Sequence, residues 1–164
     1  MTDSEITYAI RGAIYDVYMV LGPGLLESAY EMVLAYHLRQ EGFAVQTQVP
    51  ISLSYGDIEI PMAYRLDMLV NDKVIVELKS VDSIEKIHYK QLRTYLRLSH
   101  KHTGILVNFN TQNILNSIHT IHDVYDIPVE KKISFISLIS LAPLCGRVGQ
   151  IKIIHFSGNT KNNH

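Results

Sequence analysis

Residues 65–79 read RLDMLVNDKVIVELK, two β-rich runs on either side of a polar turn, and this hairpin decides the fold. Strands so rich in valine, isoleucine and leucine are expected to be buried. An ionised side chain among them costs several kcal/mol unless a partner or a metal ion compensates it. The two runs nonetheless contain Asp67, Glu77 and Lys79. Their placement predicts a functional site on the hairpin.

The length of the turn decides whether the two carboxylates meet. Side chains alternate faces along a strand, and cross-strand partners share a face. A two-residue turn at positions 71–72 would therefore set Asp67 and Glu77 on opposite faces. A three-residue connection over residues 71–73, with an αL or bulged residue, pairs them with their Cβ atoms roughly 5 Å apart. A functional site requires this second register.

Two carboxylates at that separation raise each other's pKa, and a divalent cation between them removes the repulsion. Hard oxygen ligands without cysteine favour Mg²⁺ or Mn²⁺ over zinc. The alternative is structural: Asp67 caps a turn or pairs with Arg65, while Glu77 and Lys79 form an ion pair on a solvated face. These residues alone leave both interpretations open.

Composition limits the classes of protein to which the chain can belong. Its 164 residues suit one domain, and 15 basic against 16 acidic residues argue against coating nucleic acid through bulk positive charge. The only cysteine, Cys145, excludes an internal disulfide and favours a reducing compartment. We find no secretory signal, and the apolar stretch 133–145 falls short of the roughly 20 residues that span a bilayer. We expect a cytoplasmic protein.

Hydrophobic periodicity predicts the order ααβββαβ, an α/β arrangement. Helices are expected over residues 6–21, 26–38 and 84–99, and strands over 43–55, 58–70, 73–79 and 103–109. We expect residues 1–122 to form the domain and residues 123–164 to be a C-terminal extension that packs on it or trails from it.

The predicted helix 84–99 has two contrasting faces at 100° per residue. The apolar face contains Ile84, Ile87, Leu92, Leu96 and Leu98. Three polar or aromatic residues project from the middle of that face: His88, Gln91 and Tyr95. Basic residues form a stripe on the other side: Lys86, Lys90, Arg93 and Arg97. The stripe is either a phosphate-binding surface or an ordinary solvated face.

Several motifs in order carry a resemblance to a known family. Gly24-Leu25-Leu26-Glu27-Ser28-Ala29-Tyr30 fits a GxxExxY signature; Arg65-Leu66-Asp67, Glu77-Leu78-Lys79, Gln91-x-x-x-Tyr95 and Leu106-Val107-Asn108-Phe109 follow it. Together they resemble the PD-(D/E)XK nuclease superfamily and, within it, the bacterial GxxExxY family, from about residue 6 to 121. One departure is Leu66, which stands where the superfamily's motif has proline.

The resemblance implies a restriction-endonuclease-like core, a mixed central sheet flanked by helices, with a metal site at the end of the hairpin. Asp67 and Glu77 would be metal-binding and catalytic carboxylates. The backbone carbonyl of Leu78 would be a further ligand, and Glu27 would reach the metal from its helix, directly or through water. The implied cofactor is Mg²⁺ or Mn²⁺.

The same resemblance assigns the remaining roles. Lys79 would orient the attacking water or neutralise charge in the transition state, and Gln91 and Tyr95 would hold the edge of the site or a substrate phosphate. The implied activity is hydrolysis of phosphodiester bonds in nucleic acid, DNA before RNA. A catalytically silent adaptor that binds nucleic acid or protein is the alternative.

Two further hypotheses concern other residues. His100-Lys101-His102 and His119-x-x-His122 have the spacing of transition-metal ligands, although neither pair comes with a nearby cysteine or matched carboxylate. Three tyrosines on the first helix and the apolar tail make a homodimer plausible. These tyrosines are Tyr8, Tyr15 and Tyr18.

Overall fold

The computed structural model describes residues 1–55 and 57–122. Its elements are α1 (Asp3–Leu21), α2 (Glu27–Gln40), β1 (Val45–Tyr55), β2 (Ile58–Val70), β3 (Val74–Lys79), α3 (Lys86–Ser99), β4 (Thr103–Asn108), a 3-10 turn η1 (Ile114–Ser117) and β5 (Ile118–His122). The predicted order ααβββαβ is confirmed, and β5 extends it by one strand that the sequence did not predict. The predictions for residues 123–164, including Cys145, lie outside the described residues.

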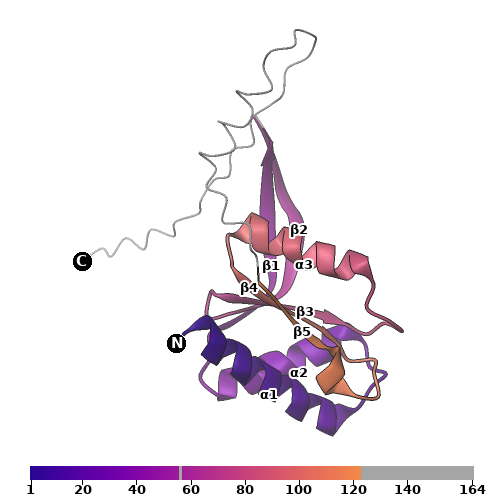
Figure 1. Cartoon of the computed structure of the whole chain (residues 1–164). Coiled ribbons are helices and arrows are strands. Elements are labelled where there is room, and N and C mark those ends of the chain that lie inside the picture. The colour runs from indigo at the N-terminus through magenta and orange to yellow at the C-terminus, as the bar shows by residue number, and fades with distance from the viewer. Residues whose placement is uncertain (56, 123–164) are drawn as a thin grey trace, which may run out of the picture.

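The five strands form one mixed sheet in the order β1-β2-β3-β4-β5. Only β3 and β4 pair in parallel, because α3 connects them; the other neighbours are antiparallel. Helices α1 and α2 cover one face of the sheet and α3 covers the other, while the hairpin of β1 and β2 extends beyond α3 (Figure 1). The predicted α/β class with a flanked mixed sheet is confirmed.

The described helices include none that is both long and apolar enough to cross a membrane.

The turn between β2 and β3 has the three-residue form that a functional site requires. Val70 pairs with Val74 and the hydrogen-bonded ladder continues to Met68 and Val76. Two of the three connecting residues, Asn71 and Asp72, have left-handed φ values of 51° and 56°. Asn and Asp tolerate this conformation better than other non-glycine residues, which explains how the turn closes. Continued by one residue, the register sets Asp67 opposite Glu77.

The hairpin of β1 and β2 changes direction at Asp67. Leu66 packs on the α3 side of the sheet, whereas Met68, two residues later, packs on the side of α1 and α2. Residues two apart on a regular strand share a face, so the alternation breaks between them. On β1 the residue facing Asp67 in this register is Gln48, whose φ of 54° is left-handed, and the ladder omits this pair. Asp67 therefore sits at a bend.

Helix α3 begins two residues later than predicted, at Lys86, and one residue of its predicted apolar face is exposed. Leu92, Tyr95 and Leu96 are buried, but Ile87 is 63% exposed although the helical wheel placed it on the apolar face. Ile87 lies in the first turn of α3, where it lines a surface hollow beside β2 instead of the core. The basic stripe is confirmed as an exposed face.

Gly104 on β4 makes room for α3, which yields a stability prediction. A Cβ on Gly104 would lie 2.9 Å from Cδ1 of the fully buried Leu92. We expect Gly104→Ala to destabilise the protein by about 1–3 kcal/mol, because a packed core cannot absorb the added methyl group. The matched control is Gly12→Ala in α1, where no atom lies within 4 Å. It should stabilise by roughly 0.4–1 kcal/mol.

Urea unfolding of both variants and wild type measures these changes as shifts of midpoint at constant slope. A Gly104→Ala protein as stable as wild type would contradict the close packing of α3 on β4.

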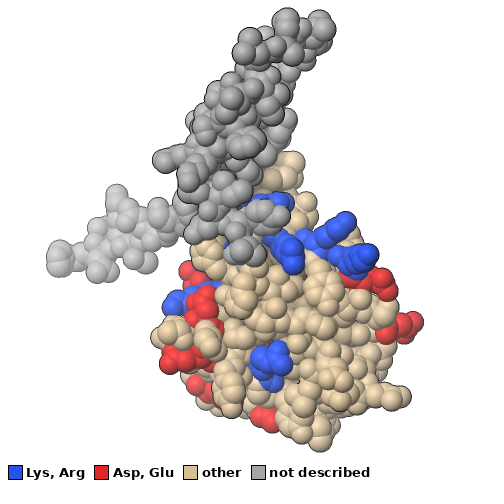
Figure 2. Space-filling view, in the orientation of Figure 1, with Lys and Arg blue, Asp and Glu red and all other residues tan. Residues whose placement is uncertain are grey.

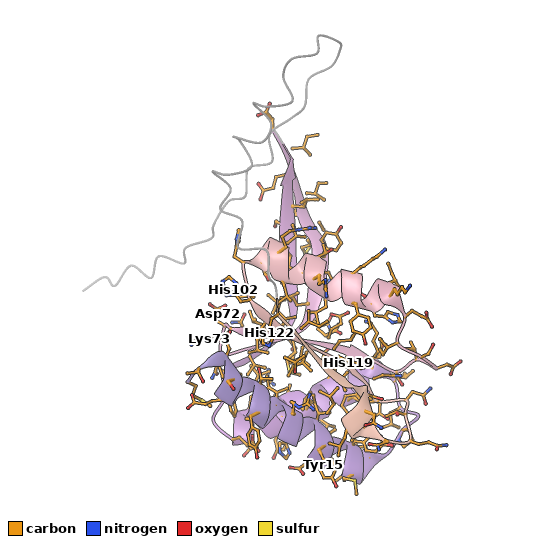
Figure 3. The ribbon with its side chains drawn as sticks, viewed as in Figure 1. Tyr15, Asp72, Lys73, His102, His119 and His122 are labelled. Atoms are coloured by element: carbon orange, nitrogen blue, oxygen red, sulfur yellow. The ribbon has the colours of Figure 1, made fainter. Side chains whose placement is uncertain are left out.

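The tyrosines of α1 have different surroundings. Tyr8 and Tyr15 are exposed, and Tyr15 lies on the outer side of the helix pair (Figure 3). Tyr18 instead donates a hydrogen bond of 2.5 Å to the carbonyl oxygen of Thr111. A homodimer formed through this helix stays a prediction, with Tyr8 and Tyr15 as its accessible residues.

Candidate functional site

Glu77 is the most unusual residue of the sheet. It is 1% exposed, in a strand whose neighbours are aliphatic. Its Oε1 accepts a hydrogen bond of 2.7 Å from Nζ of Lys79, two residues along the same face of β3. Its Oε2 is also buried and has no hydrogen-bond partner within the described part of the chain. A buried carboxylate oxygen without a partner is costly, so this atom is suited to receive a ligand.

Asp67 approaches β3 from the bend in β2. Its Oδ2 accepts a hydrogen bond of 2.9 Å from the backbone N–H of Leu78. The carboxylate is therefore tied to the strand between Glu77 and Lys79, and it does not pair with Arg65 as the structural alternative expected. That alternative also placed the ion pair of Glu77 and Lys79 on a solvated face. The pair exists, but Glu77 is buried.

Glu27 reaches the same strand end from the first turn of α2. Its Oε1 accepts a hydrogen bond of 3.0 Å from the backbone N–H of Ser80, and Oγ of Ser80 donates to the carbonyl oxygen of Leu25 at 2.7 Å. Tyr30 fixes the start of this helix: its ring stacks on Phe109 at 4.2 Å between centroids, and its hydroxyl donates to Gly22. Packing thus holds Glu27 at the end of β3.

Asn108, the last residue of β4, secures the segment that follows β3. Its Oδ1 accepts a hydrogen bond from the N–H of Val81, and its Nδ2 donates to the carbonyl oxygen of the same residue, at 3.1 and 2.8 Å. The N–H of Phe109 also donates to the carbonyl oxygen of Lys79 at 2.8 Å. These bonds hold the segment after β3 in one position, as preorganised sites require.

The electrostatics of the cluster follow from burial of like charges. Burial raises the pKa of Glu77 to about 7, and the negative charge of Asp67 adds to the effect. Burial likewise raises the pKa of Asp67, although the hydrogen bond from the N–H of Leu78 acts to lower it. For Lys79 burial alone would lower the pKa, but the hydrogen bond and charge of Glu77, with the other carboxylates, raise it. Near neutral pH the cluster holds one ammonium among three carboxyl groups, and Glu77 binds a proton part of the time.

Gln91 and Tyr95 form a pair on the sheet-facing side of α3. Nε2 of Gln91 donates to the Tyr95 hydroxyl oxygen at 2.8 Å, so the two polar groups satisfy each other. Burial raises the pKa of Tyr95, and the charges of Glu77 and Asp67 contribute to this rise. The Tyr95 hydroxyl is thus close enough for the charges of the two carboxylates to act on it. The Tyr64 ring on β2 packs against Tyr95 with centroids 5.7 Å apart.

Sequence reasoning missed two residues beside the cluster. Glu31 lies one turn after Glu27 on α2, and its Oε2 accepts a hydrogen bond of 2.5 Å from Nε2 of Gln48. Burial raises the pKa of Glu31, and the charge of Asp67 acts in the same direction. The i, i+4 spacing of Glu27 and Glu31 was a usable signal. The left-handed Gln48 was not, because a strand pattern gives no sign of it.

The donor set suits a hard divalent cation. Glu77 supplies an unpartnered buried oxygen, and Asp67 and Glu27 supply carboxylate oxygens of the type that Mg²⁺ prefers. Within residues 1–55 and 57–122, however, no group of three or more His, Cys, Asp or Glu side chains is arranged to hold a metal ion. The oxygen Oε1 of Glu77 is bonded to Lys79 in this arrangement.

The histidine pairs do not form an alternative centre. His119 packs edge-on against Tyr89 on the α3 side of the sheet. His122 is three residues farther along the strand and therefore on the other face, where its Nδ1 lies 3.4 Å from Oγ1 of Thr103. His102 and His122 lie near Asp72 and Lys73 at the turn end of the hairpin, and His119 lies farther along β5 (Figure 3). Within the described residues no such histidine belongs to a group of three or more metal-ligating side chains, so the structure does not support a histidine-based metal site.

Comparison with known proteins gives one match. The family model of the PD-(D/E)XK nuclease superfamily matches residues 4–121, which is most of the chain. No curated protein and no solved structure was found to match the chain. The matched range runs from α1 to β5 and contains every residue of the cluster described above.

Proposed function

The chain belongs to the PD-(D/E)XK nuclease superfamily, and we propose that it hydrolyses phosphodiester bonds of nucleic acid, DNA before RNA, with Mg²⁺ or Mn²⁺. The observation that carries the proposal is the buried, unpartnered Oε2 of Glu77, beside an ammonium and a second carboxylate. In its charged form such an atom opposes folding, whereas a metal-dependent active site uses it as a ligand.

The acidic residues would hold the metal. Asp67 and Glu77 are its proposed carboxylate ligands, the backbone carbonyl of Leu78 a further one, and Glu27 completes the shell directly or through water. When bound, a divalent cation would neutralise the charge of the phosphate and lower the pKa of a bound water. The raised pKa of Glu77 supports this assignment, because a cation would restore the carboxylate form that burial disfavours.

The other residues would act on the substrate. Lys79, which stays protonated, would orient the attacking water and neutralise the negative charge that develops on the phosphate in the transition state. Gln91 and Tyr95 would hold a phosphate at the edge of the site, which is supported by their hydrogen bond and by the contribution of the Glu77 and Asp67 charges to the raised pKa of Tyr95.

We propose the GxxExxY family as the subgroup, because Glu27 of that motif reaches the backbone of Ser80 at the site. We further propose that residues 1–122 form the catalytic domain, residues 123–164 are an extension of it, and the protein acts in the cytoplasm.

A cleavage panel tests the proposal. The purified full chain is incubated with linear, nicked and single-stranded DNA and with RNA, each with Mg²⁺, Mn²⁺ or EDTA. We expect cleavage that EDTA abolishes, with DNA cut in preference to RNA. Binding without cleavage under every metal would overturn the proposal and favour the non-catalytic adaptor.

A further inference from the structure

A surface hollow of about 340 Å³ opens between β2 and α3. Its lining consists of Tyr64, Ile87, Lys90, Gln91, Thr94 and Tyr95. Ligand sites in proteins span roughly 300–1,000 Å³, so the hollow has room for a small planar group. Two of its walls, Gln91 and Tyr95, belong to the proposed active site, so the hollow adjoins the reaction.

The walls of the hollow are suited to an aromatic ring. Tyr64 stays 38% exposed while Tyr95 packs against its ring, and the exposed Ile87 adds an apolar surface. Aromatic side chains in such positions stack on bases, and the contact tolerates any sequence because every base has a π-face. The Tyr95 hydroxyl accepts from Gln91, and no acceptor within the described residues takes its hydrogen, so it can donate to a ligand.

Positive charge lies directly beside these rings. Lys and Arg gather along α3, next to the hairpin of β1 and β2 (Figure 2). The residues of this basic stripe, none of which forms an ion pair with a described residue, are Lys86, Lys90, Arg93 and Arg97. Lys90 is the one that also lines the hollow. On a protein of near-neutral net charge, such a local group of cations is suited to a local anionic partner such as a phosphate chain.

We propose that this hollow holds one unpaired nucleotide of the substrate strand, with its base against Tyr64 and Ile87 and a backbone phosphate at Lys90. A base inside a duplex is stacked on both faces and cannot meet Tyr64, so the nucleotide must be single-stranded or extruded. The inference rests on the proposed function and adds to it the substrate class: a strand that is unpaired beside the scissile phosphate.

Tyr64→Ser tests the stacking contact. Binding of a single-stranded oligonucleotide containing 2-aminopurine is followed by fluorescence, with Ca²⁺ in place of the catalytic metal, and compared with a fully paired blunt duplex. We expect Tyr64→Ser to bind the single strand about 5- to 100-fold more weakly and to lose the quenching of 2-aminopurine. Tyr64→Phe should bind like wild type. The matched control is Tyr8→Ser, an exposed tyrosine on α1, which should also bind like wild type.

Lys90→Ala tests the phosphate contact. It should weaken binding of every single strand uniformly and reduce the slope of log affinity against log salt by about one. An unchanged slope would overturn the placement of a phosphate at Lys90.

The outcomes separate this inference from the proposed function. Suppose that cleavage is sensitive to EDTA but that Tyr64→Ser cleaves and binds the single strand as well as wild type does. This result would overturn the nucleotide site in the hollow and leave the nuclease proposal standing. Binding of the single strand through Tyr64 without cleavage under any metal would overturn the nuclease proposal and keep the hollow. A wild-type protein that binds the blunt duplex more tightly than the single strand would also overturn the nucleotide site in the hollow. Thermal melting of Tyr64→Ser and Tyr64→Phe shows whether a loss of binding reflects unfolding.

Discussion

Lys79→Ala is expected to lower metal-dependent cleavage by about 10²- to 10³-fold while the protein stays folded. Among residues 1–55 and 57–122, Lys79 supplies the only cation of the carboxylate cluster, and its Nζ lies 2.7 Å from Oε1 of Glu77. Without it the developing charge of the transition state loses a preorganised partner. Folding survives because Glu77, whose pKa is already raised, can take up a proton and become neutral.

The comparison with Asp67→Ala sharpens this prediction. Asp67→Ala should lose cleavage and also Mg²⁺ binding, whereas Lys79→Ala should keep Mg²⁺ binding, because it removes no proposed ligand. Single-turnover rates measure the first effect and calorimetric titration with Mg²⁺ the second.

Lys73→Ala is the matched control for Lys79→Ala. Lys73 lies at the turn end of the same hairpin, where its Nζ donates to the carbonyl oxygen of Met1 at 2.8 Å (Figure 3). It should cleave like wild type. Equal activity of wild type, Lys79→Ala and Asp67→Ala would contradict the assignment of the active site.

The hairpin shows how far local rules reach. The three-residue turn followed from the requirement that Asp67 and Glu77 share a face, and the pairing of Val70 with Val74 confirms it. Period-two and period-3.6 patterns also located the elements, because each buries one face. Such rules fix which residues of one element share a side.

What the sequence did not predict depends on contacts between distant segments. Ile87 is apolar and in phase with the core, yet it lies in the first turn of α3 and lines a hollow instead. Glu31 accepts a hydrogen bond from Gln48, and Gln48 is itself the left-handed residue of β1 opposite Asp67. Strand β5 is half buried and short, with two histidines in five residues, so its pattern is weak. Tertiary packing decides each of these features.

The bend at Asp67 connects these observations. In a regular strand Asp67 would pair with Gln48 of β1. The ladder omits this pair, and the Asp67 carboxylate accepts a hydrogen bond from the N–H of Leu78 on β3. Left-handed non-glycine residues cost of order 1–3 kcal/mol each, and they persist where surrounding structure compensates for them. Among these residues Gln48 lies beside the carboxylates, where such strain is expected to serve a function.

The stability of the metal-free protein is expected to fall as the pH rises. Burial raises the pKa of Glu77 from 4.5 to about 7, so the folded protein binds this proton more tightly than the unfolded chain does. The stabilisation is therefore complete below about pH 4.5 and is lost as the pH rises through 7. At 1.36 kcal/mol per unit, the loss amounts to at most about 3 kcal/mol. Metal-free wild type should accordingly melt at lower temperature at pH 8 than at pH 5.

Glu77→Gln isolates this contribution, because the amide keeps the shape of the side chain and carries no titrating proton. In EDTA we expect it to lose most of the dependence on pH, with a smaller remainder of the same sign from Asp67 and Glu31, whose pKa values are also raised. Glu59→Gln, at an exposed glutamate on β2, should keep the wild-type profile.

Addition of Mg²⁺ is expected to reverse this loss of stability. A cation favours the carboxylate form of Glu77, so it should restore stability to wild type at pH 8 far more than at pH 5, and much less to Glu77→Gln. Thermal unfolding of the three proteins at both pH values, with EDTA or Mg²⁺, provides the measurement. Parallel profiles for wild type and Glu77→Gln would mean that Glu77 is not the buried group that titrates, and that the metal binds elsewhere or not at all.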